Sequence, residues 1–174
     1  MYAIGPDDLC IRLADFPASS TGAPLPGIIS TEHEVVLYYQ LNDTPPEWDG
    51  SYTTQIDSHT ERLTAIVKWV RCYQHMFGSG GEYVAHRHPL AERGFGPFGN
   101  FEVTNSSWKQ THIEMNKGHY DFFPGMYDDL RHFLLPFHDS TFECLAKGFE
   151  IEIVHGSSID IMKRIIGYLD QGET

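Results

Sequence analysis

Apolar and β-branched residues gather in short runs along the chain, and the spacing within each run predicts its structure. The run over 34–41 is apolar without alternation, which is typical of a strand buried on both faces. Residues 149–155, F-E-I-E-I-V-H, alternate between apolar and acidic positions, as a half-buried strand does. Similar short runs predict strands over 100–104, 132–138 and 141–147.

Two main helices are predicted from a period near 3.6 residues. The first spans 58–77: S-H-T-E at its start matches a capping box, and the following apolar residues recur three or four positions apart. The second begins at Ser157 or Ser158, and Ile161, Ile165 and Leu169 form its apolar stripe. A shorter helix is predicted over 107–115 and another over 121–131.

These elements predict an α+β fold. We expect a mostly antiparallel sheet of about five strands, with the two main helices packed on one face. The chain has 174 residues, of which 41% are hydrophobic, and this length and composition suit one domain over 1–174. Prolines and glycines in residues 1–30 predict an extended N-terminal arm before the first long strand.

Composition narrows the classes of partner. Twelve basic residues against 24 acidic ones give a net charge of −12, which disfavours nucleic-acid binding. No secretory signal or membrane-spanning run is present, so we expect a cytoplasmic protein. The three cysteines, Cys10, Cys72 and Cys144, lack the spacing of a disulfide framework or a structural zinc site.

The stretch F-H-D-S-T-F-E-C over 137–144 concentrates polar chemistry in a predicted hairpin. A two-residue loop at Asp139 and Ser140 pairs Phe137 with Phe142 and turns Cys144 toward the core. His138 and Glu143 then become diagonal neighbours, roughly 7 Å apart by backbone, and so could form an acid–base pair. The alternative is a polar turn with a cross-strand pair near the rim.

A metal site is a second chemical hypothesis. If residues 82–88 form a short edge strand, the imidazoles of His86 and His88 lie on the same side of it. Two imidazoles placed in this way supply half of the ligands of a metal site. Further ligands would come from Glu102, His138 or Glu143. The alternative is a His-x-His sequence that binds no metal, and the sequence requires no cofactor.

The segment N-S-S-W over 105–108 leads from a predicted strand into a helix. Free N–H groups at a helix start bind anions, so Asn105, Ser107 and Trp108, together with Arg93 from the preceding glycine-rich loop, form a candidate ligand site. The alternative is an N-cap with a tryptophan that anchors the helix. No phosphate-binding or serine-hydrolase motif of the G-x-S-x-G type is present.

Several segments resemble a group of uncharacterised bacterial proteins of similar size: H-P-L-A-E-R-G over 88–94, F-E-V-T-N-S-S-W over 101–108, and F-H-D-S-T-F-E-C. M-N at 115–116 and G-A-P-L-P over 22–26 extend the resemblance. It implies that these segments meet in space, and it implies no activity, cofactor or catalytic residue.

Two functional hypotheses follow. The first is an acidic binding domain that docks a protein or a small ligand. The second is a hydrolase, either metal-assisted or dependent on an acid–base pair, with His138 as base and Glu143 or Glu102 as its partner. Whether the chain is an enzyme is left open by the sequence. A homodimer through an edge strand is compatible with it.

Overall fold

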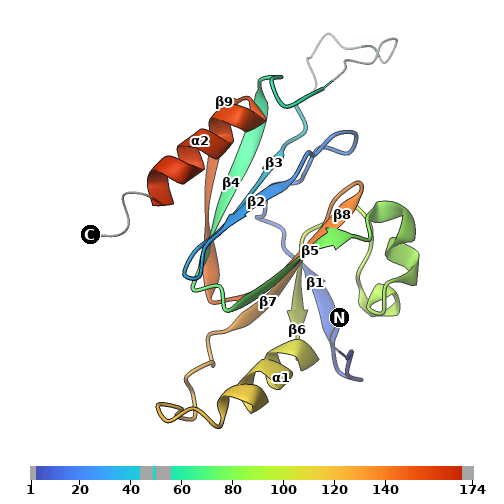
Figure 1. Ribbon diagram of the computed structural model, residues 1–174. Helices are drawn as coiled ribbons and strands as arrows, with labels where there is room; N and C mark the ends of the chain where they lie inside the picture. Colours follow the sequence, from blue (N-terminus) through green and yellow to red (C-terminus); the bar gives the residue numbers. More distant parts are fainter. Residues whose placement is uncertain (1–2, 44–48, 50–55, 170–174) are drawn as a thin grey trace. The chain divides into compact units, whose positions relative to one another are not determined.

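The computed structural model describes residues 3–43, 49 and 56–169. As predicted, the fold is mixed α+β with antiparallel sheets, but there are two sheets instead of one (Figure 1). Contacts divide the chain into two compact units that are each discontinuous in sequence. Unit 1 comprises Met1–Phe16 and Val70–Gly148, and unit 2 comprises Pro17–Trp69 and Phe149–Thr174. The expectation of one folding domain over 1–174 stays a prediction.

Unit 1 contains a five-stranded sheet in the order β1-β6-β7-β8-β5. Its strands are β1 (Leu9–Arg12), β6 (Phe101–Thr104), β7 (Arg131–Pro136), β8 (Ser140–Ala146) and β5 (Gln74–Ser79). Helix α1 (Ser107–Asn116) follows β6 after two residues and agrees with the helix predicted over 107–115. Two 3-10 helices, η1 (Glu82–Arg87) and η2 (Ala91–Arg93), lie between β5 and β6 in the chain.

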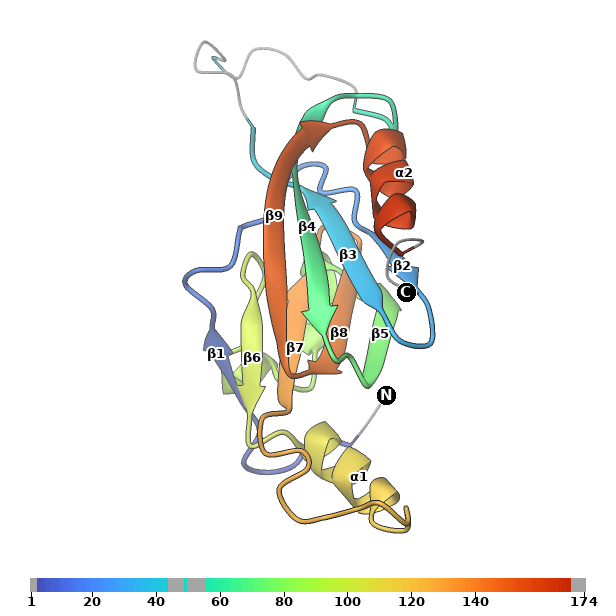
Figure 2. The ribbon, with the colours of Figure 1, turned by 90° about the vertical axis from the view of Figure 1, so that its left-hand side faces the viewer.

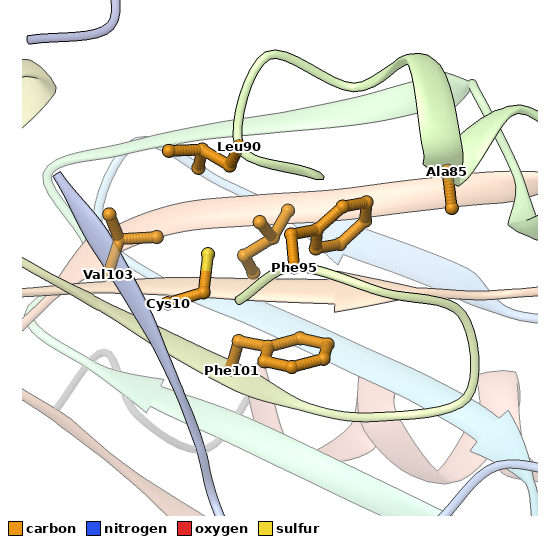
Figure 3. Close-up of a cluster of buried hydrophobic side chains, with 7 residues drawn as sticks. Cys10, Ala85, Leu90, Phe95, Phe101 and Val103 are labelled. Carbon is orange, nitrogen blue, oxygen red and sulfur yellow. The ribbon is translucent and has the colours of Figure 1, made fainter. Parts of the chain in front are cut away.

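The core of unit 1 includes a cluster that joins β1, the 3-10 segment and β6 (Figure 3). Its buried members are Cys10, Ala85, Leu90, Phe95, Phe101, Val103 and Leu134. A second cluster holds α1 in place, because Trp108 packs with Tyr127, Leu130 and Leu145. Burial of this apolar surface stabilises the segments that carry the candidate site.

Unit 2 contains a four-stranded sheet in the order β2-β3-β4-β9. Its strands are β2 (Gly27–Ser30), β3 (Val35–Gln40), β4 (Arg62–Val70) and β9 (Gly148–Gly156). Helix α2 (Ser158–Leu169) covers one face of this sheet, where Ile161 and Ile165 pack against Val36, Tyr38 and Ile66 (Figure 2). The predicted C-terminal helix is therefore confirmed, and Ser157 caps its start by accepting the Asp160 N–H.

The helix predicted over 58–77 is wrong, because this region forms β4 and β5. The capping signal marks a turn, in which the Asp57 carboxylate accepts the backbone N–H groups of His59 and Thr60. From Thr64 to Val67 every residue is buried, as in a central strand covered on both faces. A continuous apolar run also contains helical spacings, so periodicity alone could not separate the two structures.

Two shorter predictions in unit 1 are also wrong. The edge strand over 82–88 is the 3-10 helix η1, in which Ala85 is the one buried residue. The predicted helix over 121–131 is a series of turns that leads into β7. Strands β1 and β2 fall inside the predicted N-terminal arm; no apolar run marks either strand, since each is only four residues long.

The hairpin of β7 and β8 forms, with its loop one residue earlier than predicted. Leu135 pairs with Phe142, and the Phe137 N–H donates to the Ser140 carbonyl, so His138 and Asp139 form the loop. The pairing shifts by two residues relative to the prediction. Because side chains alternate between the two faces of a strand, a shift by an even number leaves each side chain on its predicted face. The expected apolar face is buried: Phe133, Leu135, Phe137, Phe142, Cys144 and Ala146.

Candidate functional site

The register of the hairpin changes the partner of each predicted catalytic residue. His138 lies at the loop, where its Nδ1 is 2.7 Å from Glu82 Oε1 and its ring meets Tyr83 edge to face. The predicted pair of His138 with Glu143 is therefore not formed. Glu143 instead lies opposite Leu134, which makes His132 the diagonal neighbour of Glu143 on the same face of the sheet.

Glu143 lies between two imidazole rings. His132 Nε2 is 3.0 Å from Glu143 Oε2, and His88 Nε2 is 3.9 Å from Glu143 Oε1. His88 Nδ1 accepts the Leu90 N–H, which leaves the proton of that ring on the nitrogen that faces Glu143. His88 and Glu143 were predicted from the sequence as site residues, whereas His132 was not.

The other nitrogen of His132 meets a serine. Ser106 Oγ is 2.9 Å from His132 Nδ1, so Ser106, His132 and Glu143 form a continuous hydrogen-bonded chain of three side chains. We call this chain the Ser106 relay. Its members are 3%, 1% and 8% exposed, respectively, so the relay belongs to the interior and not to the rim of the sheet. The ring of Trp108 packs edge to face on His132, with 5.1 Å between ring centroids.

The local backbone sets the position of Ser106. Strand β6 ends at Thr104, Asn105 adopts a left-handed conformation with φ of 53°, and Ser106 is the N-cap of α1. Ser106 Oγ accepts the Lys109 N–H at 3.1 Å, as an N-cap hydroxyl does. This sharp strand-to-helix turn presents the hydroxyl to the neighbouring strand β7.

The predicted ligand site at the start of α1 contacts the chain's own N-terminal segment. The Asp8 carboxylate, which is 2% exposed, accepts hydrogen bonds from the N–H and the hydroxyl of Ser107 at 2.8 and 2.9 Å. Asn105 donates to the Asp7 carbonyl, and Arg93 donates to the Gly5 carbonyl. An internal carboxylate therefore stands where an external anion was expected.

A pocket of about 330 Å³ opens beside the relay, where β6, β7 and α1 meet. We call it the Ser106 pocket. Its charged and polar wall includes Glu102, Ser106, Lys109, Asp128, Arg131 and His132. A second pocket, of about 410 Å³, lies in unit 2 among β3, β4, β9 and the end of α2, and its lining includes none of the predicted site residues.

Glu102 and Arg131 both line this pocket and pair with each other. The predicted pairing of Glu102 with a histidine is therefore not the one that forms. The two carboxylate oxygens of Glu102 accept bonds from Arg131 Nε and Nη2 at 3.0 and 2.5 Å. This bidentate pair raises the pKa of Arg131 above its ordinary value. Lys109 Nζ donates to the Asp128 carbonyl across the same pocket at 3.3 Å.

The predicted metal ligands do not converge. His86 is exposed on η1, while His88 is half-buried and faces Glu143. Within residues 3–43, 49 and 56–169, no group of three or more histidine, cysteine, aspartate or glutamate side chains is arranged to hold a metal ion. A divalent metal at His86 and His88 stays a prediction.

The buried cysteines are held as thiols. Burial, with the nearby charges of Glu143 and Asp8, raises the pKa of Cys10 to about 12. Burial also raises the pKa of Cys144 well above its ordinary value. These thiols are poor nucleophiles, in agreement with the prediction that Cys144 points inward.

No family model, curated protein or solved structure matches this chain. The resemblance of its segments to uncharacterised bacterial proteins therefore stays a prediction. In the part of the chain that the structure describes, no helix is both long enough and apolar enough to cross a membrane.

Two residues of the relay, Ser106 and His132, were not predicted as site residues, although the sequence around each contained a signal. Ser106 is an N-cap type at a strand-to-helix junction, but the prediction assigned the chemistry of that junction to Ser107. His132 shares a face of the sheet with Glu143, but the predicted loop was one residue too late and placed the diagonal contact at His138. An error of one residue in the position of the turn was therefore enough to pair Glu143 with the wrong histidine.

Proposed function

We infer that the protein is a binding domain for a small polar molecule, which it holds in the Ser106 pocket. The observation that carries this proposal is the pocket itself, whose wall brings together charges of both signs and a buried serine and histidine. Its volume of about 330 Å³ falls at the small end of ligand pockets, which span roughly 300–1,000 Å³. The ligand is therefore small.

The charges of the wall indicate the kind of ligand. The lining carries two bases, Lys109 and Arg131, and two acids, Glu102 and Asp128, of which Arg131 and Glu102 pair with each other. A lining balanced in this way complements a zwitterion better than an ion of one sign. Free amino acids and dipeptides, which carry an ammonium and a carboxylate, fit this description and the size of the pocket.

Backbone amide NMR of the intact chain tests the proposal directly. Amino acids and dipeptides are titrated singly, and we expect at least one to shift the amide resonances of Thr104, Asn105 and Gln110, which line the pocket. A panel that shifts no resonance of these residues, or that shifts only those of unit 2, contradicts the proposal.

Two variants that each remove one lysine charge test whether Lys109 contacts the ligand. Lys109→Met removes the ammonium from the pocket and should weaken binding by about tenfold or more, since a hydrogen bond to a charged group contributes about 1.5–3 kcal/mol. Lys117→Met is the control: Lys117 is exposed on α1's C-terminal side and pairs with Glu114 outside the pocket. Equal affinity in both variants would show that Lys109 does not contact the ligand.

A further inference from the structure

We propose that the Ser106 relay hydrolyses small polar carboxylic esters, with Ser106 as nucleophile and His132 as general base. This inference rests on the proposed function, because it assigns a reaction to the same pocket. Serine, histidine and carboxylate stand in unbroken contact, 2.9 Å from Ser106 Oγ to His132 Nδ1 and 3.0 Å from His132 Nε2 to Glu143. Many enzymes with a serine nucleophile use such a sequence of contacts.

Hydrogen-bond roles along the relay fix the direction of proton transfer. Ser106 Oγ accepts the Lys109 N–H, so its own hydrogen is available to donate to His132 Nδ1. An ionised Glu143 carboxylate only accepts, so the proton of a neutral His132 ring lies on Nε2, and Nδ1 holds the lone pair that faces Ser106. In this arrangement the imidazole holds a lone pair toward the serine hydroxyl, as a general base does.

The position of Ser106 in the fold favours attack on a bound molecule. The side chain caps α1, a helix of ten residues, and Ser106 and His132 both line the Ser106 pocket. The positive end of the helix dipole stabilises negative charge that develops on Oγ. Lys109 lines the same pocket, and its ammonium offers positive charge to the tetrahedral oxyanion.

The reaction proceeds in two halves. Ser106 Oγ forms a bond to the ester carbonyl carbon while its proton passes to Nδ1 of His132. The bond between that carbon and the leaving alcohol oxygen then breaks, and the alcohol takes the proton from Nδ1. In the second half, water attacks the carbonyl carbon of the acyl group and gives a proton to Nδ1 of His132. The bond between that carbon and Ser106 Oγ then breaks. The carboxylic acid leaves, and Oγ takes back the proton from Nδ1.

Glu143 acts as a positioning residue in this scheme. Its carboxylate holds the His132 ring in the required tautomer and stabilises the imidazolium that forms when the serine is deprotonated. His88 Nε2 lies 3.9 Å from the second oxygen of that carboxylate. Glu143 therefore acts through His132 and does not contact the substrate.

Labelling with an alkyl fluorophosphonate tests the nucleophile. The reagent loses fluoride and leaves a phosphonyl group on an activated serine, which intact-mass and peptide measurements locate. We expect one group per chain on Ser106, and a labelling rate at least tenfold lower in His132→Gln. We also expect the chain to hydrolyse p-nitrophenyl acetate faster than Ser106→Asn does.

The variants separate chemistry from folding. Ser106→Asn removes the nucleophile but keeps an N-cap acceptor, because asparagine caps helices as well as serine does. Ser140→Ala, in the same unit, is the control and should label at the wild-type rate. In Glu143→Gln we expect slower labelling and an upfield shift of the His132 imidazole N–H resonance, a signal that a purely structural role would leave in place.

Two outcomes overturn the inference. One is a folded wild-type chain that takes up no label and hydrolyses the ester no faster than Ser106→Asn. The other is labelling that persists in Ser106→Asn. In either case, amino-acid or dipeptide shifts at the pocket in the NMR titration would leave the binding function intact, whereas an absence of those shifts removes the binding proposal separately.

Discussion

At the scale of single residues, some buried polar groups of unit 1 are satisfied by partners far away in sequence. Asp8 illustrates this, because its carboxylate joins Gly5 to Ser107, 99 residues further along the chain. The contacts could not be derived from spacing, since they depend on which strand becomes the neighbour of β6. The N-cap type of Ser106, by contrast, was visible in sequence.

The first prediction concerns Asp8. Replacing Asp8 with Ala should lower the free energy of unfolding by about 2–3 kcal/mol, because the Ser107 N–H and hydroxyl at the start of α1 lose their buried acceptor. Urea unfolding followed by circular dichroism measures the change. Asp7→Ala is the control, since Asp7 is exposed and engages Asn105 only through its backbone carbonyl. Equal losses would show that the Asp8 carboxylate has no special role.

At the scale of elements, most of the predicted segments formed as expected, and the longest predicted helix, over 58–77, did not. β3, β6, β7, β8, β9, α1 and α2 all lie where their patterns place them. β4 was mistaken for a helix because its residues are apolar on both faces, so that either period fits. Five of its nine residues are β-branched or tryptophan, a composition that favours a strand: Thr64, Ile66, Val67, Trp69 and Val70.

The second prediction concerns the face of α2. Ile165 is fully buried against the sheet of unit 2, whereas its neighbour Ile166 is 58% exposed. Ile165→Ala should destabilise the chain by about 3 kcal/mol through lost burial and the cavity left behind. Ile166→Ala should change stability by no more than about 0.5 kcal/mol. Thermal unfolding of both variants measures the two losses of stability. A larger loss in Ile166→Ala than in Ile165→Ala would mean that α2 packs on the sheet with a different face.

At the scale of the whole molecule, burial lowers the pKa of two histidines, His75 and His112. His112 lies between the rings of Tyr73 and Tyr127, and His75 stacks on Phe142. Each ring therefore takes up its proton at a lower pH in the folded chain than in the unfolded chain, where the ordinary pKa is 6.5. The unfolded state therefore binds more protons below that pH.

The third prediction is a loss of stability in mild acid. As pH falls from 7 through 6.5 toward 5, the urea midpoint should decrease, because protonation favours the unfolded state. His112→Phe keeps an aromatic ring in the cluster and should flatten this dependence. The midpoint measured at several pH values for both chains provides the comparison. A midpoint that rises on acidification, or an identical slope in the variant, would contradict the assignment.

The discontinuity of the two units has a consequence for biosynthesis. Strand β1 pairs with β6, and Leu9 and Thr104 are 95 residues apart, so β1 leaves the ribosome long before its partner exists. During that interval the chain of β2, β3 and β4 emerges, and these strands pair in sequence order as neighbours. Local pairings form faster than distant ones. The nascent protein should therefore begin its second unit before it can close the first, with β1 waiting unpaired at the amino end.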